Sequence, residues 1–158
     1  MSENFYIGLS KHGKGVFAKR DVEKGELIFV FYGDLKEGYR YDEYLPFSEY
    51  WVQIDDRRWI DPMSIGRYVN HSCEPNSAVY GLFELRALRN INSYEEIFFD
   101  YDTTDWDAEV CKFNCHCLTK NCRRIIREYN FLSDVTKQRY REYGLIPFFL
   151  LELEDNHQ

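Results

Sequence analysis

Two short stretches hold most of the side chains that can do chemistry. Residues 70–76 bring Asn, His, Ser, Cys and a second Asn together in seven positions. Such side chains bond to nearby backbone, which predicts a shaped loop, although an ordinary surface turn with a buried cysteine fits equally well. Residues 96–101 are an apolar, strand-like run that ends in Asp100 and Tyr101. A carboxylate and a hydroxyl at the end of a strand are typical of a site.

The cysteines indicate a metal. Four of the five lie between residues 111 and 122, and three of these form the pattern Cys115-x-Cys117-x4-Cys122. Disulfides would leave one cysteine unpaired, whereas three thiolates this close converge on one tetrahedral zinc ion in a folded knuckle. A fourth ligand is then needed, and Cys111 is the candidate by proximity in the sequence. A cluster of free, reduced thiols is the alternative to a metal site.

A glycine turn lies upstream, where residues 13–18 read Gly-Lys-Gly-Val-Phe-Ala. By itself it indicates a tight turn, and it is not a dinucleotide fingerprint because the third glycine and the following helix are absent. The glycine turn, residues 70–76, residues 96–101 and the cysteine pattern occur in this order in SET-domain lysine methyltransferases. They cover most of residues 8–125, so the chain resembles that family, as a SET domain followed by a post-SET zinc motif. With no cysteine-rich pre-SET region in view, we expect a minimal catalytic unit.

The resemblance implies an activity and a set of site residues. The activity is methyl transfer from S-adenosylmethionine to the ε-amine of a lysine in a basic protein, such as a histone or histone-like tail. Tyr101 takes the catalytic position, and Phe31 and Phe99 line the lysine channel. The implied ligands of one structural zinc ion are Cys73, Cys115, Cys117 and Cys122, with Cys111 as the rival of Cys73. The positions implied to contact the cofactor are Lys14, Gly15, Tyr50, Arg67, Asn70, His71 and Ile125.

The chemistry expected at Tyr101 concerns the lysine amine. A lysine ammonium has a pKa of about 10.4, so removing its proton at pH 7 costs about 4.6 kcal/mol if nothing shifts that pKa. A narrow, dry channel and the facing sulfonium both lower the pKa. Holding the reactants in line supplies much of the acceleration, and weak C–H···O contacts to a hydroxyl and to carbonyls orient the methyl group. In the alternative interpretation Tyr101 simply ends a strand.

Several residues depart from the family pattern. Phe31 stands where the family usually has a tyrosine, which removes a hydrogen-bond partner for the lysine amine. Leu118 replaces a common glycine, Ile125 replaces a frequent aromatic residue, and residues 61–67 lack the usual Gly-Asn pair. Each change weakens a detail of lysine or cofactor binding and leaves the catalytic tyrosine in place.

Phe99 sets an expectation for the product. In the family this position holds tyrosine or phenylalanine, and a tyrosine hydroxyl holds the amine or a water that fills the space a methylated nitrogen needs to turn. Phe99 and Phe31 both lack that hydroxyl. We therefore expect di- or trimethyl-lysine.

Composition limits the size and the partners. At 158 residues the chain fits one domain, which hides roughly 70% of its unfolded surface. The formal net charge of −7 argues against direct nucleic acid binding and favours a basic, lysine-bearing partner. The chain shows no apolar segment long enough for a signal peptide or a membrane span, so we expect an intracellular protein. The oligomeric state is left open.

The elements that must position these residues are mostly short strands. The fold class expected is mainly β with some α: several small β-sheets around a knot-like active-site core, with a C-terminal helical extension. Strands are expected at residues 5–18, 26–32, 50–54, 59–61, 77–82, 84–88 and 97–100, and helices at 123–129 and 133–143. Residues 36–49 are expected to form a short helix or loop insertion, and the apolar tail 145–153 to pack on the body. The division expected is a SET domain at 1–107, a zinc-binding segment at 108–126 and a helical extension at 127–158.

Two alternatives to an active methyltransferase remain open. The first is a catalytically weak SET-like zinc module that binds cofactor or peptide, and Phe31 keeps it open. The second is a zinc-ribbon module on an unrelated fold, which would leave residues 70–76 and 99–101 unexplained.

Overall fold

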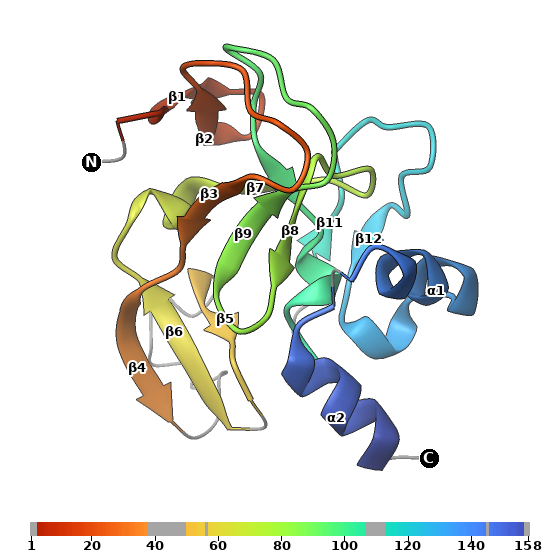
Figure 1. Ribbon diagram of the computed structural model, residues 1–158. Helices are drawn as coiled ribbons and strands as arrows, with labels where there is room; N and C mark the ends of the chain where they lie inside the picture. The colour runs from red at the N-terminus through yellow and green to blue at the C-terminus, as the bar shows by residue number, and fades with distance from the viewer. Residues whose placement is uncertain (1–2, 38–49, 56, 107–112, 145, 157–158) are drawn as a thin grey trace.

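The computed structural model describes residues 3–37, 50–55, 57–106, 113–144 and 146–156. Within these ranges the chain forms five small β-sheets, followed by two α-helices near the C-terminus (Figure 1). The prediction of a mainly β fold of small sheets with a C-terminal helical extension is therefore confirmed. The insertion predicted at residues 36–49 lies largely outside the described residues.

The first sheet is an N-terminal hairpin. Strand β1 (Phe5–Ser10) pairs antiparallel with β2 (Gly13–Ala18). Gly13 has a φ of 97°, a left-handed conformation that glycine adopts without strain, so the turn forms where the sequence predicts it. Val16 is fully buried and attaches the hairpin to the main core.

Two antiparallel sheets of three strands form the body, in the orders β3-β9-β8 and β4-β6-β5. Their strands are β3 (Leu27–Val30), β4 (Gly33–Glu37), β5 (Val52–Gln53), β6 (Arg58–Pro62), β8 (Ser77–Tyr80) and β9 (Glu84–Ala87). The predicted hairpin across residues 50–61 and the predicted pair across 77–88 are both present.

Gly33 separates two strands. Strand β3 ends before it, at Val30, and Gly33 opens β4, where it lies opposite Pro62 of β6. A Cβ at Gly33 would lie 1.8 Å from the carbonyl oxygen of Asp61. The glycine thus permits close approach of two strands, a use of glycine that sequence alone does not distinguish from a break.

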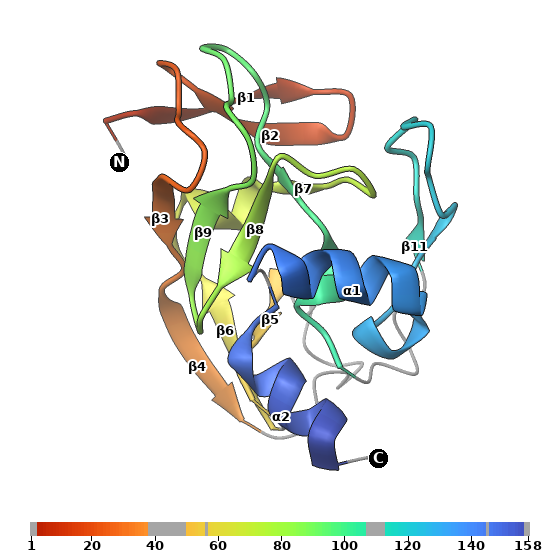
Figure 2. The same ribbon diagram turned by 45° about the vertical axis from the view of Figure 1, so that its right-hand side comes forward.

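A short parallel pair brings the two chemistry-bearing stretches together. Strand β7 (Asn70–His71, labelled in Figure 2) pairs with β10 (Phe98–Phe99). In this register Phe99 lies opposite His71. The loop after β7 is closed by Asn76, whose Nδ2 donates to the carbonyl of Glu96 at 2.7 Å and whose Oδ1 accepts from the amide of Phe98 at 2.8 Å. Asn76 is buried, so residues 70–76 form the predicted shaped loop rather than a surface turn.

The segment after the cysteine pattern differs from its prediction. Strand β11 (Phe113–Asn114) pairs antiparallel with β12 (Ile125–Ile126), so the helix predicted at residues 123–129 is wrong. Arg124 has a φ of 68°, and its carbonyl accepts from the amide of Cys115 at 2.8 Å. Pairing with a distant strand therefore overrides the local preference of this charged, breaker-free run for helix.

Two helices follow, α1 (Asp134–Glu142) and α2 (Phe148–Asn156). Ser133 caps α1 by accepting from the amide of Thr136, and Gly144 follows its end with a φ of 66°, as the sequence predicts. Short 3-10 turns complete the fold: η2 (Ile65–Tyr68), η3 (Tyr101–Thr103) and η4 (Tyr129–Phe131).

The helical extension has its own apolar core against the body. Leu150 of α2 and Tyr140 of α1 pack with Tyr129 and Trp106, and Ala78 of β8 belongs to the same cluster. The apolar tail therefore packs on the body, as predicted. Among the described residues, neither helix has the length and apolar character needed to cross a membrane.

Candidate functional site

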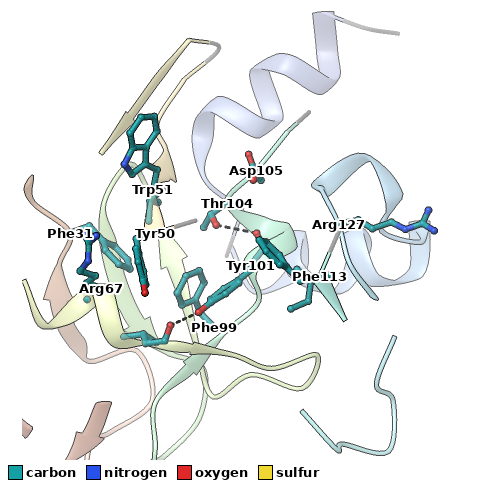
Figure 3. Close-up of a pocket in the computed structure, with 14 residues that line it drawn as sticks. Phe31, Tyr50, Trp51, Arg67, Phe99, Tyr101, Thr104, Asp105, Phe113 and Arg127 are labelled. Carbon is teal, nitrogen blue, oxygen red and sulfur yellow. Dashed lines mark hydrogen bonds between the residues drawn. The ribbon is translucent and has the colours of Figure 1, made fainter. Parts of the chain in front are cut away.

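A narrow cavity of about 50 Å³ lies between the body and the C-terminal segment (Figure 3). The rings of Phe31 and Phe99 meet edge to face with centroids 6.0 Å apart, and the rings of Phe99 and Tyr101 are 4.9 Å apart. Other parts of its wall come from Tyr50, Arg67, Val69, Thr104, Ile126 and Arg127. The structure thus brings the predicted catalytic and channel residues together around one cavity.

Tyr101 is held at three points. Its hydroxyl donates to the carbonyl of Val69 at 2.8 Å, and its amide donates to Nδ1 of His71 at 3.2 Å. Its carbonyl accepts from Thr104 Oγ1 at 3.1 Å (Figure 3). Burial raises the pKa of the Tyr101 phenol, so the hydroxyl is neutral near pH 7. A neutral hydroxyl and a carbonyl oxygen therefore lie side by side at the cavity wall.

The glycine turn meets β7 through side chains. Asn70 Nδ2 donates to the carbonyl of Lys14 at 3.0 Å and to Oε1 of Glu96 at 2.7 Å. Ser10 Oγ donates to Oε2 of Glu96 at 2.8 Å. A Cβ at Gly15 would lie 2.2 Å from Glu96 Oε1, so a larger residue here would displace the Glu96 side chain. Three predicted cofactor residues are thus gathered here, and Glu96 joins them without having been predicted.

Of the other predicted cofactor residues, some line the cavity and one does not. The Arg67 guanidinium lies 4.2 Å from the centroid of the Tyr50 ring and forms an ion pair with Asp61, and Tyr50 and Arg67 both line the cavity. Ile125 is partly exposed on β12 and is absent from the cavity wall. Its neighbour Ile126 is buried and lines the cavity instead, because successive side chains of a strand point to opposite faces.

His71 connects the cavity to the cysteines. Its Nδ1 accepts from the Tyr101 amide, so the ring proton belongs on Nε2, which lies 3.3 Å from the sulfur of Cys73. Burial lowers the pKa of His71 to about 4, so the ring is neutral at pH 7 and can hold this tautomer. Sequence comparison assigns His71 to the cofactor, whereas in the structure its ring nitrogens position Tyr101 and the cysteine loop.

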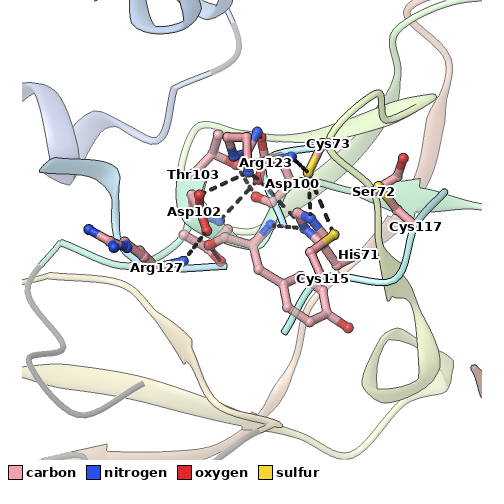
Figure 4. A network of polar contacts seen from close by, with 12 residues as sticks. His71, Ser72, Cys73, Asp100, Asp102, Thr103, Cys115, Cys117, Arg123 and Arg127 are labelled. Atoms are coloured by element: carbon pink, nitrogen blue, oxygen red, sulfur yellow. Dashed lines mark hydrogen bonds and ion pairs between the residues drawn. The ribbon is translucent and has the colours of Figure 1, made fainter. Parts of the chain in front are cut away.

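A buried ionic network lies behind Tyr101 (Figure 4). Arg123 donates to both carboxylate oxygens of Asp100, at 2.9 and 2.5 Å, and to Asp102 at 2.8 Å. Asp100 is fully buried. Burial and the charge of Asp100 raise the pKa of Asp102 to about 7. Burial opposes the charge of Arg123, but the two carboxylates raise its pKa, so it stays cationic. Sequence reasoning missed this network because its members are distant in the chain.

Four cysteine sulfurs converge next to this network. The Sγ atoms of Cys73, Cys115, Cys117 and Cys122 all lie within 4.8 Å of one another. Zinc binds thiolate sulfur at about 2.3 Å, which puts tetrahedral ligands about 3.8 Å apart; the separation of Cys73 and Cys115 is 3.6 Å. The donor set and its spacing fit a structural zinc site. Cys111, the rival ligand, lies outside the described residues.

The thiols differ in how readily they ionise. Burial raises the pKa of Cys73, and it raises the pKa of Cys115 to about 11. Burial opposes ionisation of Cys117 too, but hydrogen bonds from Thr119 and neighbouring groups lower its pKa to about 6. A cation is therefore needed to hold all the cysteines as thiolates.

Leu118 offers a test of backbone strain in this segment. It has a φ of 59° and is exposed, so its side chain contributes little packing, and a left-handed conformation costs a non-glycine residue about 1 kcal/mol. We expect Leu118→Gly to raise the free energy of unfolding of the zinc-loaded protein by about that amount in urea titration. Leu118→Ala keeps a Cβ and serves as the control. Equal stability of the two variants would show that the backbone at this position is not strained.

Residues 13–102, more than half of the chain, match the SET domain family. The chain belongs to the SET-domain family. This match spans the glycine turn, the loop at residues 70–76 and Tyr101, so the predicted SET domain is confirmed, whereas the post-SET motif that follows it stays a prediction.

Relatives by sequence are much longer proteins. The chain is 34% identical over 133 residues to the variant-silencing SET domain-containing protein of Plasmodium falciparum (isolate 3D7), covering 71% of this chain and 5% of that protein. It is 31% identical over 140 residues to histone-lysine N-methyltransferase trithorax of Drosophila virilis, covering 77% of this chain and 4% of that protein. The chain thus spans a small fraction of the length of these relatives.

A solved structure of KRYPTONITE in complex with mCHG DNA and SAH is similar in fold. The TM-score is 0.63 at 26% identity, covering 78% of this chain and 29% of that one. The predicted SET fold is therefore confirmed. That structure contains DNA, so the expectation that this chain does not bind nucleic acid directly stays a prediction, as does the expected intracellular location.

Proposed function

We propose that this SET domain is an S-adenosylmethionine-dependent protein-lysine N-methyltransferase, with Tyr101 as its catalytic residue. The observation that carries the proposal is the pairing of the Tyr101 hydroxyl with the Val69 carbonyl at the wall of an aromatic cavity. Two oxygens side by side can orient a methyl group through C–H···O contacts. The position of these oxygens beside a narrow channel suits transfer to an amine that enters it.

The aromatic walls prepare the lysine. Phe31 is 2% exposed and Phe99 4% exposed, so the channel side chains offer little water access. A lysine amine between these rings favours its neutral form, because desolvation penalises the ammonium. Neutralisation supplies the lone pair that attacks the methyl group, and the rings hold the amine in line with it.

The glycine turn fits the amino-acid end of S-adenosylmethionine. The Glu96 carboxylate, the Asn70 amide and the Lys14 carbonyl meet there within hydrogen-bonding distance, with Gly15 allowing close backbone approach. Bound S-adenosylmethionine supplies a transferable methyl group on a sulfonium. In this proposal Lys14, Gly15 and Asn70 hold that ligand, with Tyr50, Arg67, His71 and Ile125 as the remaining contacts that the family resemblance implies.

We assign one structural zinc ion to the cluster of Cys73, Cys115, Cys117 and Cys122. The ion would join the loop at residues 70–76 to the segment at 113–126. That segment supplies Ile126 to the cavity and Arg123 to Asp100, so the metal would hold one side of the site closed.

The proposed substrate is a lysine in a histone or histone-like tail. The net charge of −7 favours a basic partner, and the trithorax relative is itself a histone-lysine methyltransferase. The test is incubation with core histones and methyl-labelled cofactor, followed by mass spectrometry of the labelled residue. Label on lysine supports the proposal. Cofactor binding in calorimetry without label in histones or in a lysate would favour the alternative of a binding module that has lost turnover, which Phe31 keeps open.

The product is expected to be di- or trimethyl-lysine, and Phe99→Tyr tests the reason. A cavity of about 50 Å³ holds few atoms beyond the amine, so one added hydroxyl, or the water it anchors, takes space that a methylated nitrogen needs. We expect the variant to shift products toward monomethyl-lysine in mass spectrometry at saturating cofactor.

Phe29→Tyr is the matched control, because Phe29 contacts Phe31 at 5.3 Å between ring centroids and is absent from the cavity wall. Its products should match those of the wild type. Exclusively monomethyl-lysine from the wild type after long incubation would contradict the role given to Phe99.

A further inference from the structure

One hydroxyl links the C-terminal helices to the residue next to Tyr101. Tyr140, on α1, donates from its hydroxyl to Oδ2 of Asp100 at 2.6 Å. Tyr140 is 5% exposed and Asp100 is 0% exposed, so the bond is shielded from water. Helix α1 lies beyond residues 13–102, which match the SET domain family. The bond thus joins an element outside the matched region to the active-site strand.

The hydrogen-bond donors around Asp100 explain why this hydroxyl matters. Asp100 shares the guanidinium of Arg123 with Asp102, so its oxygens also depend on other donors. Oδ2 of Asp100 receives one bond from Arg123 and one from Tyr140, and Oδ1 receives one from Arg123 and one from the Asp102 amide. Without the Tyr140 hydroxyl, Oδ2 would keep a single donor. Leaving a buried acceptor short of donors is costly, so Asp100 would turn toward the donors that remain.

Rotation of Asp100 would reach Tyr101 directly. Asp100 is the N-cap of η3, and the first residue of η3 is Tyr101. The Tyr101 amide donates to His71 and its hydroxyl donates to Val69, so a shift of the η3 cap would move the ring relative to these two partners. The oxygens that orient the methyl group must hold their positions closely, because misplacement by about 1 Å can cost about 100-fold in rate.

We propose that Tyr140 is a positioning residue for methyl transfer: through Asp100 it sets the orientation of Tyr101, so the C-terminal helices are part of the catalytic apparatus. The inference rests on the proposed methyltransferase activity. Docking of α1 does not depend on the hydroxyl, because the Tyr140 ring packs in the apolar cluster and Lys137 pairs with Glu154 of α2 at 3.6 Å. Removing the hydroxyl should therefore change the orientation of Tyr101 without undocking α1.

The test is Tyr140→Phe beside Tyr143→Phe, a control at the end of the same helix with an exposed ring. We expect Tyr140→Phe to lower kcat by about tenfold, with KM for cofactor and peptide changed by less than about twofold. Each kcat is divided by the number of cofactor sites counted in calorimetry, so a misfolded fraction cannot mimic the effect. A site-normalised kcat equal to that of the control would overturn the proposal, as would a loss confined to KM.

A ¹⁹F NMR measurement tests the orientation of Tyr101 without an activity assay. With 3-fluorotyrosine incorporated, the ¹⁹F resonance of Tyr101, assigned by its absence in Tyr101→Phe, should shift in Tyr140→Phe and stay in place in Tyr143→Phe. An unshifted resonance in Tyr140→Phe overturns the proposal. If the wild type methylates no substrate, the proposed function fails, and the resonance alone decides whether Tyr140 orients Tyr101.

Discussion

Tyr101→Phe is expected to lower the rate of methyl transfer by at least tenfold, which is about 1.4 kcal/mol in the barrier. The variant keeps the ring that packs 4.9 Å from Phe99 and removes the hydroxyl that donates to Val69 at 2.8 Å. Ground-state binding of the cofactor at the glycine turn does not involve this oxygen, so cofactor affinity should change little. The loss should therefore appear in kcat.

The measurement is single-turnover methyl transfer at saturating cofactor, with cofactor affinity from calorimetry. Tyr94→Phe is the control, because Tyr94 is 74% exposed and its hydroxyl has no part in the cavity. Losing a buried hydroxyl that bonds to Val69 also costs about 1 kcal/mol of stability, so the folded fraction is measured for both variants. A wild-type rate in folded Tyr101→Phe would remove Tyr101 from the catalytic role.

Local chemistry made the centre of the site predictable from the sequence. Residues 70–76 carry the side chains that fold their own loop, as the buried Asn76 shows, and a strand ending in Asp100 and Tyr101 leaves few places for the hydroxyl. The convergence of Cys73 with the other three cysteines was likewise expected, although through family resemblance rather than spacing.

What the sequence did not reveal depends on contacts between distant residues. The sequence predicts a charged helix that includes Arg123. In the structure the segment is held instead by pairing of β12 with β11 and by the bonds of Arg123 to Asp100 and Asp102. Tyr140 lies within the helix predicted at 133–143, and no spacing in the sequence connects it to Asp100, 40 positions earlier. Ile125 is placed near the cofactor by family resemblance alone, and its strand register, which turns Ile126 into the cavity wall, could not be predicted from a run expected to be helical.

Removal of zinc is expected to abolish most activity while leaving the body folded. The main core contains none of the four cysteines, so the small sheets should persist after chelation. Residues 113–126 should lose their order, because the small apolar cluster of Cys115 and Ile126 is built around the four cysteines that the metal would hold together. Losing Ile126 from the cavity and Arg123 from Asp100 should lower methyl transfer by more than about tenfold. Hydrogen exchange and a transfer assay on the same chelated sample measure both effects.

The ligand set is tested by Cys73→Ser beside Cys111→Ser. Losing one thiolate should weaken zinc binding by about 100-fold or more, so we expect Cys73→Ser to lose its metal in competition with a chelator. Cys111→Ser is the matched control, since it removes a thiol from the same run of cysteines. An empty site in Cys111→Ser, with a full one in Cys73→Ser, would reverse the assignment of the fourth ligand.

The number of protons released when zinc binds tests whether the buried cysteine thiols are its ligands. Burial raises the pKa of Cys73 and raises that of Cys115 to about 11, so both are protonated at pH 7 before the metal arrives. Both must ionise to bind zinc, so each ion should release at least two protons, and affinity should rise by about 100-fold per pH unit near neutrality. Calorimetry in buffers of different ionisation enthalpy counts these protons. Release of fewer than one proton per zinc would mean that the buried thiols do not bind the metal, because no thiol with so high a pKa can become a ligand at pH 7 without losing its proton.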